Sequence, residues 1–314
     1  MEMPPILAFP ALAGMSYPRL EIRRVMRALS GPEEIMALPE FDRAAVRILM
    51  TSASRGCSRE LADALPNLAF VVSQGAGQER VAMAELAARG VTVRSIGEAL
   101  TDDVADLAMA LTHMLCRDLV RADVFARGGE WRKARFPLGV SLVGMTMGIG
   151  GLSGRIGQAI AARAAASRMK IAGLDRPSNK GLSASAHDGW LSLAGASDVL
   201  VLALPASADE RPVIGAAELA ALGPSGWLIN VARGSLVDTE ALIDALEKRT
   251  VAGAALDVLD DEPNVPDRLA ALPNVVLTPH IGAQTWGQRA RAAAIAEDAI
   301  LAFLDGDDGG VASR

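Results

Sequence analysis

Short apolar runs alternate with helical patterns between about residues 145 and 283, and this alternation restricts the possible folds more than any other feature of the chain. Strands joined by crossover helices run parallel to one another. We therefore predict an α/β fold with a doubly wound parallel sheet. The expected strands are 146–151, 170–175, 197–204, 226–232, 251–258 and 275–280.

The first hundred residues repeat the alternation on a smaller scale. Strands are expected near 6–12, 46–52 and 68–74, and helices near 19–29 and 59–65. A chain of 314 residues also exceeds what one hydrophobic core usually organises. We therefore predict two α/β domains.

Two long helical patterns decide where these domains are expected to divide. Apolar residues recur at helical spacing from Val104 to Leu115, which predicts one helix over 101–128 that bridges domains or subunits. The pattern over 286–304 predicts a helix that packs back on the first domain, and the tail after it is expected to be disordered. The predicted domains are 1–99 with 284–314, which is discontinuous, and 100–283, which includes the helix 101–128.

Charge and cysteine usage exclude several classes of partner. The formal net charge is −6 with acidic and basic residues interspersed, so no nucleic-acid-binding surface is expected. No run approaches the roughly 20 apolar residues of a membrane span, and the first residues lack the basic start of a secretory signal. Cys57 and Cys116 have neither disulfide-like nor metal-like spacing. We therefore expect a cytoplasmic protein that acts on small molecules, without metal, membrane or nucleic acid.

The segment GGLSGRIG, residues 150–157, lies where an expected strand meets an expected helix. Glycines at such a turn let the backbone approach the pyrophosphate of a dinucleotide at the helix N-terminus. The spacing departs from the fingerprint G-x-G-x-x-G, because Gly154 and Gly157 fill the last two positions and Leu152 the first. Either one residue is inserted and Gly151 makes the first turn, or the loop is distorted. A glycine turn with a purely structural role is the alternative interpretation.

Asp175 ends the next expected strand, where an acid accepts hydrogen bonds from the ribose hydroxyls of a bound adenosine. This position favours NAD as the cofactor. Arg176 and Lys180 follow closely, and either would meet the 2′-phosphate of NADP, so NADP is the alternative. An ordinary surface turn would carry the same residue types.

Three residues at the ends of later strands, Arg233, Asp257 and His280, are candidates for the chemistry, because open α/β sheets bind ligands at that edge. Reducing a 2-keto acid requires a cation for the carboxylate, and the guanidinium fork of Arg233 suits it. It also requires a proton donor for the carbonyl oxygen, and histidine donates and recovers a proton near neutral pH. His113 in an apolar helix and His187 in a polar loop are expected to serve packing and solvation, which leaves His280.

A histidine acts better as an acid beside a carboxylate, which fixes its tautomer and favours its protonated form. The run LDDEP offers Asp260, Asp261 and Glu262, and their spacing does not choose among them. An acidic run before proline is, taken alone, more often a solvated loop.

Several segments taken together resemble the D-isomer-specific 2-hydroxyacid dehydrogenases, and the glyoxylate/hydroxypyruvate reductase branch is most similar. The likeness covers nearly the whole chain outside the first 40 residues and the tail. It implies two Rossmann-like or flavodoxin-like parallel-sheet domains, with the NAD(P)-binding domain inserted into the substrate-binding domain. The segments are 64–77, 101–111, 127–139, 154–166, 228–246, 252–263 and 273–285.

The resemblance also implies a reaction and the residues that carry it. The reaction is reduction of a small 2-keto acid, of the glyoxylate or hydroxypyruvate type, to the D-2-hydroxy acid with NAD(P)H. Arg233 binds the substrate carboxylate and polarises the carbonyl. His280 is the acid/base and Glu262 pairs with it, which resolves the choice among the three acids.

Further residues are similar to those that hold the cofactor and the substrate in this family. Asp257 corresponds to the residue that holds the nicotinamide carboxamide, and Arg155 with Ile156 to the pair at the pyrophosphate. Cofactor contacts are expected from Gly151, Gly154, Arg155, Ile156, Gly157, Asp175, Arg176, Val231 and Asp257. Substrate contacts are expected from Arg233, from the backbone amides of Gly75, Ala76 and Gly77, and from Trp131, which a homodimer lends to the partner's pocket.

The chain departs from the family pattern at two places, and the sequence is also compatible with other functions. The glycine spacing is shifted, and GAGQE at 75–79 stands where the family more often has a glycine-rich stretch ending in aspartate. Formate enzymes of this superfamily have glutamine beside the histidine, so Glu262 counts against formate. The remaining alternatives are a phosphite-type oxidoreductase on the same scaffold, an NAD-sensing interaction protein that resembles the corepressors, and an inactive cofactor-binding relic.

Overall fold

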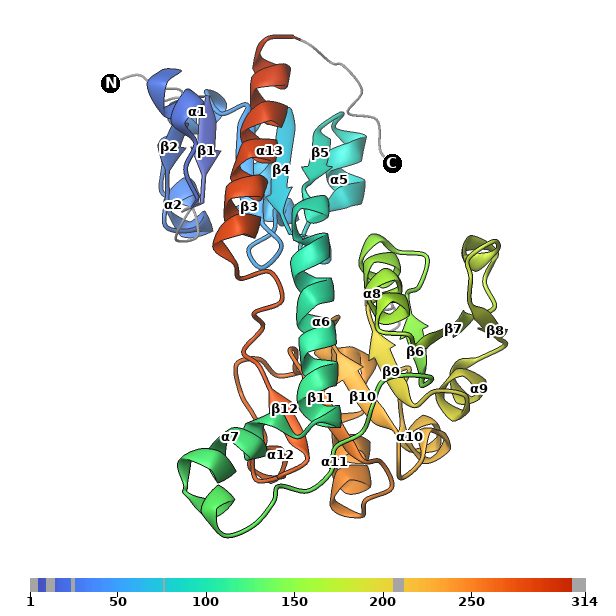
Figure 1. Ribbon diagram of the computed structural model, residues 1–314. Coiled ribbons are helices and arrows are strands. Elements are labelled where there is room, and N and C mark those ends of the chain that lie inside the picture. Colours follow the sequence, from blue (N-terminus) through green and yellow to red (C-terminus); the bar gives the residue numbers. More distant parts are fainter. Residues whose placement is uncertain (1–4, 10–14, 24–25, 76, 206–211, 307–314) are drawn as a thin grey trace. The chain divides into compact units, whose positions relative to one another are not determined.

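The computed structural model describes residues 5–9, 15–23, 26–75, 77–205 and 212–306 (Figure 1). The chain divides into two compact units, the first made of Met1–Leu100 with Gln284–Arg314 and the second of Thr101–Ala283. Each unit contains its own sheet of parallel strands with helices on its faces. The predicted fold class, two parallel-sheet α/β domains, is confirmed.

In the first unit the described strands form one five-stranded sheet in the order β2-β1-β3-β4-β5, and all its pairs are parallel. Its strands are β1 (Ile6–Ala8), β2 (Met26–Ala28), β3 (Ile48–Ser52), β4 (Phe70–Gln74) and β5 (Thr92–Ser95). Its helices are α1 (Pro18–Arg23), α2 (Pro32–Met36), α3 (Glu40–Ala44), α4 (Arg59–Asp63), α5 (Met83–Ala88), η1 (Gly97–Leu100) and α13 (Trp286–Leu304).

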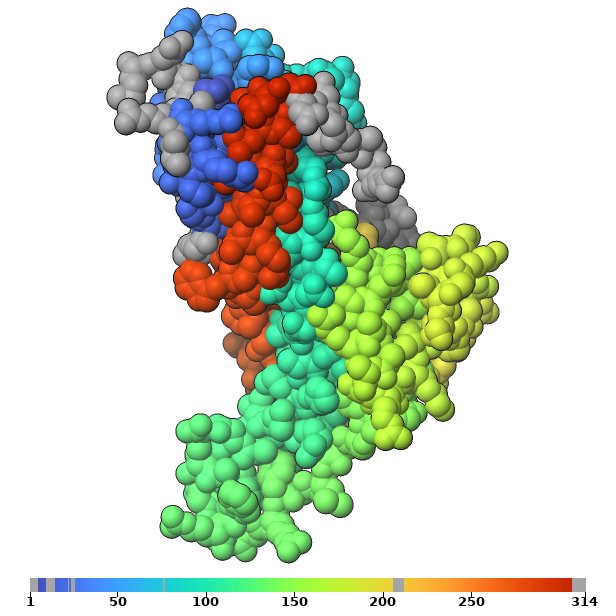
Figure 2. Space-filling model, turned by 45° about the horizontal axis from the view of Figure 1, so that its top comes forward, coloured from blue at the N-terminus to red at the C-terminus, as the bar shows by residue number. Residues whose placement is uncertain are grey.

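The central strands of this sheet are buried on both faces, which explains why they are apolar without alternation. One face carries Leu7, Leu49 and Val71 in a core with α2, α4 and α5. The opposite face packs against α13, whose small residues Ala292, Ala293 and Ala296 let the helix approach closely. The helix from the end of the chain therefore completes the core of the first unit, and Figure 2 shows it as the red band.

Two elements of the first unit differ from the sequence prediction. The helix expected over 19–29 ends at Arg23, and its second half contains the strand β2, whose pattern is mostly exposed. The strand β5 was not expected, because none of its four residues is fully buried. Both are edge strands, and edge strands lack the apolar signal that marks central ones. Predicted features within 1–4, 10–14 and 307–314, including the disordered tail, lie outside the described residues.

In the second unit the described strands form a seven-stranded parallel sheet in the order β12-β11-β10-β9-β6-β7-β8. Its strands are β6 (Thr146–Gly150), β7 (Lys170–Leu174), β8 (Ser185–His187), β9 (Val199–Leu202), β10 (Trp227–Asn230), β11 (Gly253–Leu256) and β12 (Val275–Leu277). Its helices are α6 (Thr101–Cys116), α7 (Leu119–Arg127), η2 (Glu130–Arg132), α8 (Arg155–Ala166), η3 (Pro177–Asn179), α9 (Trp190–Gly195), α10 (Ala216–Leu222), η4 (Gly234–Leu236), α11 (Thr239–Glu247) and α12 (Asp267–Ala270).

This sheet is doubly wound. Helices α9, α10 and α11 bury one of its faces in a leucine-rich core, and α6 and α8 pack on the strands from the opposite face. From β6 the chain moves outward to β7 and β8, then returns to place β9 on the other side of β6. The carboxyl ends of β6 and β9 therefore form the topological switch point, where such sheets bind ligands.

Two further predictions for the second unit were wrong in detail. The single helix expected over 101–128 is two helices, α6 and α7, separated at Asp118, which has a left-handed φ of 50°. The segment that holds His187 was expected to be a loop, but it forms the edge strand β8 beside β7. Asp118 and the residues of β8 are not buried, so the apolar periodicity marks neither change.

Candidate active site

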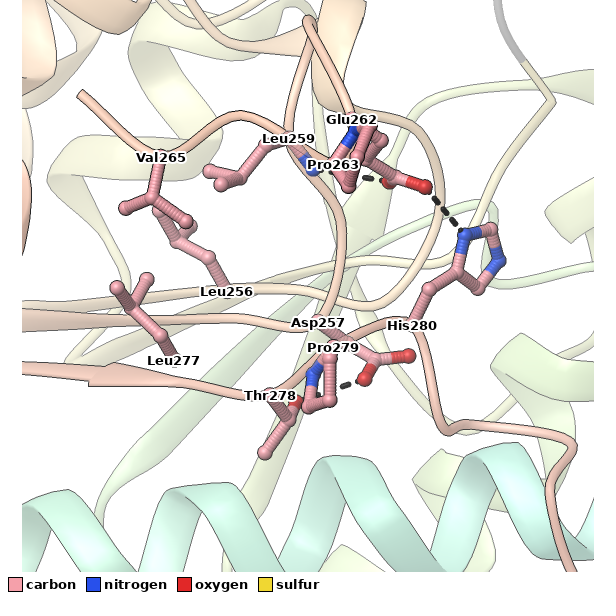
Figure 3. Close-up of a pocket in the computed structure, with 10 residues that line it drawn as sticks. All are labelled: Leu256, Asp257, Leu259, Glu262, Pro263, Val265, Leu277, Thr278, Pro279 and His280. Carbon is pink, nitrogen blue, oxygen red and sulfur yellow. Dashed lines mark hydrogen bonds and ion pairs between the residues drawn. The ribbon is translucent and has the colours of Figure 1, made fainter.

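His280 and Glu262 form a hydrogen-bonded pair at the carboxyl edge of the second unit's sheet. His280 follows β12, and Glu262 lies in the loop after β11. The His280 Nδ1 atom is 2.8 Å from Glu262 Oε2, and Glu262 Oε1 accepts a 3.0 Å hydrogen bond from the Leu259 amide. Figure 3 shows the other ring nitrogen, Nε2, on the side of the ring away from Glu262. The carboxylate thus fixes the ring so that Nε2 is presented outward.

Asp257 holds the backbone that carries His280. Its carboxylate is buried, with 3% of the residue exposed, and it accepts hydrogen bonds from Thr278 Oγ1 at 2.7 Å, the Ile281 amide at 2.8 Å and the Gly282 amide at 2.9 Å. The His280 amide donates to the Asp257 carbonyl at 2.9 Å. His280 itself has a left-handed φ of 53°, which a non-glycine residue adopts only where its surroundings enforce it. Asp257 supplies that enforcement.

Replacing Asp257 with asparagine is expected to lower kcat by about tenfold and to lower the melting temperature, because an amide NH₂ would oppose one or more of the N–H donors that the carboxylate now satisfies. The measurement is steady-state turnover beside a thermal melt. Asp260→Asn, an exposed substitution three residues away, is the matched control. Wild-type kcat in Asp257→Asn would show that the carboxylate does not position His280.

Arg233 lies in the loop that follows β10, and two neighbouring residues shape that loop. The buried Asn230 side chain donates to the Arg233 carbonyl at 2.8 Å and accepts from the Ala232 amide at 3.0 Å. A Cβ on Gly234 would lie 1.9 Å from the Leu259 carbonyl carbon and 2.2 Å from the Asp260 nitrogen. Only glycine therefore lets the Arg233 loop abut the backbone that leads to Glu262. The half-buried Arg233 and the His280–Glu262 pair thus come from adjoining loops.

The glycine turn lies at the switch point after β6. Gly151 has a φ of 86°, and a Cβ on it would lie 2.4 Å from the Ala203 carbonyl oxygen that follows β9. A Cβ on Gly157 would lie 2.1 Å from the Gly151 carbonyl oxygen. Gly151 therefore makes the turn, and the extra residue is accommodated in a tight bend in which the Gly154 amide donates to the Gly151 carbonyl at 2.9 Å.

This turn fits the pyrophosphate of a dinucleotide. The N-cap Gly154 has no side chain, so no cap occupies the amides of Arg155, Ile156 and Gly157 in the first turn of the twelve-residue helix α8. Such amides, together with the helix dipole, attract phosphate oxygens. The Ser153 hydroxyl also donates to Ser178 at 3.0 Å, which ties the turn to the loop after β7.

That loop carries the residues expected near the adenosine ribose. Asp175 follows β7 directly, its amide bonds to the His187 carbonyl at 2.6 Å, and its side chain is exposed. Arg176 and Lys180 are also exposed. The Asn179 side chain donates to the Leu174 carbonyl at 2.7 Å and keeps the loop folded over the strand end. Strand β8, beside this loop, brings His187 here and not to the catalytic pair.

A cavity of about 320 Å³ adjoins the His280–Glu262 pair. Figure 3 shows apolar side chains on the side away from the histidine ring. The pair itself is partly exposed to solvent, by 54% for the His280 side chain and 37% for the Glu262 side chain. The lining residues are Leu256, Asp257, Leu259, Glu262, Pro263, Val265, Leu277, Thr278, Pro279 and His280.

The remaining predicted residues belong to other segments of the chain. Gly75 follows β4 in the first unit with a φ of 121°, Gly77 is buried, and Ala76 lies outside the described residues. Trp131 is in η2 of the second unit and is 73% exposed. Val231, buried at the end of β10, donates its amide to the Leu202 carbonyl at 3.3 Å. His113 is exposed on α6, so its expected packing role was wrong.

Several residues that shape the site were not expected from the sequence. Asn230, Gly234, Thr278 and Gly282 hold or admit the loops that carry Arg233 and His280. Each stands within two positions of a predicted residue, in NVARG or TPHIG, so a polar or glycine neighbour at a strand end was the available signal. The two cysteines are poor nucleophiles, since burial raises the pKa of the Cys57 and Cys116 thiols to about 11.

This fold, with a glycine turn at the switch point of its sheet, is typical of α/β enzymes that bind a dinucleotide. Residues 109–282 match the model of the D-isomer specific 2-hydroxyacid dehydrogenase, NAD binding domain. A 2-ketogluconate reductase of Gluconobacter oxydans is 35% identical over 301 residues, which are 96% of each chain. The chain therefore belongs to the D-isomer-specific 2-hydroxyacid dehydrogenase family, a family of NAD(P)-dependent oxidoreductases.

Two further relatives are glyoxylate/hydroxypyruvate reductases. Glyoxylate/hydroxypyruvate reductase A of Arabidopsis thaliana is 38% identical over 83% of each chain. The crystal structure of an NADPH-dependent glyoxylate/hydroxypyruvate reductase from Sinorhizobium meliloti, in complex with NADP and malonate, is 36% identical with a TM-score of 0.84, covering 96% of this chain and 94% of that one. Among the residues that the structure describes, every helix is too short or too polar to cross a bilayer.

Proposed function

We propose that this enzyme reduces a small 2-keto acid of the glyoxylate or hydroxypyruvate type to the D-2-hydroxy acid with NAD(P)H. The observation that carries the proposal is the His280–Glu262 pair, held at 2.8 Å by a loop that the buried Asp257 fixes. The relatives that are glyoxylate or hydroxypyruvate reductases support it. The overall reaction consumes one proton and one hydride and converts the keto group to an alcohol.

The proton is assigned to His280. Glu262 accepts a hydrogen bond from the Nδ1–H group, so the protonated ring offers the proton on Nε2 to the substrate's carbonyl oxygen. The bound nicotinamide cofactor supplies the hydride to the carbonyl carbon. When the reaction runs in the opposite direction, neutral His280 accepts the proton of the alcohol at the same atom.

The substrate's carboxylate is assigned to Arg233. A guanidinium presents two parallel N–H donors that match the two oxygens of a carboxylate. The same positive charge withdraws electron density from the adjoining carbonyl group and favours the charge that develops on its oxygen. We also propose that the first unit is the substrate-binding domain and that the backbone of the Gly75–Gly77 loop contacts this carboxylate, as the family resemblance implies.

The cofactor is assigned to the second unit. The amides of Arg155, Ile156 and Gly157 would hold the pyrophosphate, Asp175 the adenosine ribose, and the Val231 and Asp257 region the nicotinamide. Asp257 already accepts three hydrogen bonds from the chain, so it has about one acceptor position left for a carboxamide. The exposed Asp175 favours NAD, and Arg176 is the residue that would meet a 2′-phosphate.

Changing Asp175 to serine is expected to raise the ratio of kcat/KM for NADPH to that for NADH by at least about tenfold, because the carboxylate repels a 2′-phosphate and accepts from a ribose hydroxyl. Initial rates with the two cofactors at a fixed 2-keto acid concentration measure the ratio. Asp188→Ser, an equal change of charge after the neighbouring strand β8, is the control. An unchanged ratio in Asp175→Ser would contradict the ribose assignment.

We also propose that the protein is a cytoplasmic homodimer. Large apolar side chains are exposed in the segment 119–143, which begins with α7, and among them Val124 is 65% and Leu138 101% exposed. In Figure 2 this segment is a green projection from the second unit. Such exposed side chains favour burial against a second copy, which would bring Trp131 to the partner's pocket. A single monomeric species in sedimentation at micromolar concentration would contradict the dimer.

The proposed function is tested by following nicotinamide absorbance with glyoxylate, hydroxypyruvate, pyruvate and phenylpyruvate, each with NADH and with NADPH. Of these four acids, we expect glyoxylate and hydroxypyruvate to be reduced with the highest kcat/KM. Absence of turnover with all four acids, in protein that binds NADH, would overturn the proposal and return phosphite oxidation or cofactor sensing to consideration.

A further inference from the structure

A further cavity, lined mostly by polar residues, lies within the first unit. It has a volume of about 160 Å³, the liquid volume of about five waters. It is formed at the carboxyl ends of β1, β3 and β4, the edge at which parallel sheets bind ligands. Its lining residues are Phe9, Met50, Thr51, Ser52, Ser54, Arg55 and Gln74.

Arg55 gives this cavity a positive charge in a fixed position. Its Nη1 donates to the Ser30 carbonyl, and its guanidinium lies over the Phe9 ring, 5.5 Å from the ring centroid. Within the described part of the chain, no carboxylate lies within ion-pairing distance of this guanidinium. The guanidinium is therefore oriented by neutral partners, and most of its N–H donors are left for a ligand.

The loop that carries Arg55 is tightly turned. The Arg55 amide donates to the Ser52 carbonyl at 3.1 Å, and the Gly56 amide donates to the same carbonyl at 2.7 Å. A second cation, Arg80, donates to the Ser54 carbonyl at 2.8 Å. Gly56 has a φ of 68°, and a Cβ there would lie 2.0 Å from the Arg80 carbonyl oxygen. The cavity is thus preorganised, which lowers the entropy that a ligand must offset.

The cavity adjoins the loop proposed to bind the substrate's carboxylate, because its lining residue Gln74 is the residue before Gly75. We propose that it is a specificity subsite for the far end of the substrate, and that Arg55 binds a second carboxylate there. Among 2-keto acids with a carbon chain beyond the keto group, those with a short, anionic tail are then preferred. The inference rests on the proposed function and adds the substrate class to it.

The test compares two keto acids that differ only at the tail. Oxaloacetate has a carboxylate where 2-oxobutanoate has a methyl group. We expect the wild-type kcat/KM for oxaloacetate to exceed that for 2-oxobutanoate by about 10- to 100-fold, the effect of a charge-assisted hydrogen bond or two. Arg55→Gln should bring this ratio close to one. Arg55→Lys, which keeps the charge without the fork, should give an intermediate ratio.

The ratio of the two kcat/KM values does not depend on the fraction of protein that is folded, because partial unfolding lowers the rates with oxaloacetate and with 2-oxobutanoate equally. Arg59→Gln, which removes a 70% exposed arginine four residues away, is the matched control and should keep the wild-type ratio. A wild-type ratio near one, or an unchanged ratio in Arg55→Gln, would overturn the subsite while glyoxylate turnover upheld the proposed function. A preference for hydroxypyruvate over pyruvate that depends on Arg55, without one for oxaloacetate, would overturn the anionic tail. No turnover even with glyoxylate would overturn both proposals.

Discussion

Replacing His280 with asparagine is expected to lower kcat by about 10²- to 10⁴-fold, the usual contribution of a positioned general acid. Asparagine tolerates the left-handed φ of 53° that His280 adopts, so the backbone of the loop should be retained. It has no group that gives up and recovers a proton near neutral pH. The loss should therefore appear in turnover, measured at saturating keto acid and cofactor, while the NADH dissociation constant changes little.

Two controls separate chemistry from structure in this experiment. His113→Asn changes an exposed histidine of α6 in the same unit and should leave kcat unaltered. Fluorescence titration with NADH reports whether the second unit still binds its cofactor. Retention of more than about a tenth of wild-type kcat in His280→Asn would assign the proton to another group or to water.

Arg233→Gln is expected to lower kcat/KM for glyoxylate by about 10²- to 10⁴-fold. Two charge-assisted hydrogen bonds to a carboxylate contribute about 1.5–3 kcal/mol each, and every 1.36 kcal/mol corresponds to a factor of ten. Because the same cation also stabilises charge on the carbonyl oxygen, kcat should fall as well as KM rise. Steady-state kinetics over a wide range of glyoxylate concentrations measures both parameters.

Arg249→Gln removes an exposed arginine of the same unit and is the control for the loss of one positive charge. A melting temperature close to wild type in Arg233→Gln would show that the fold is intact. If kcat/KM fell by less than about fivefold in that folded variant, the carboxylate would have to be held by other groups.

The central strands of both sheets were predictable because burial on two faces gives them continuous apolar runs, as in Ile48–Ser52 and Val199–Leu202. The edge strands β2, β5 and β8 were not, since none of their residues is fully buried. The break at Asp118 was also missed, because a left-handed aspartate leaves the apolar periodicity on either side intact. The apolar pattern of a sequence reflects which residues are buried, so it predicts an element poorly where the residues of that element are only partly buried.

The sequence predicted those residues of the candidate site that follow directly on the ends of β-strands. Arg233, Asp257 and His280 each follow a β-strand, and the parallel topology gathers strand ends at one edge. The pairing of His280 with Glu262, and not with Asp260 or Asp261, came from the family resemblance, because loop geometry sets it. The hydrogen bonds by which Asp257 holds the His280 loop could not be predicted from the sequence, because their donors include amides of residues 24 and 25 positions away in the chain.

The most direct test of the account is the configuration of the product that wild-type enzyme makes from hydroxypyruvate and NAD(P)H. Chiral chromatography of the reaction mixture should show D-glycerate alone, formed in equal amount to the cofactor oxidised. L-glycerate, or cofactor oxidation without glycerate, would contradict the assignment of this chain to D-specific reduction of a 2-keto acid.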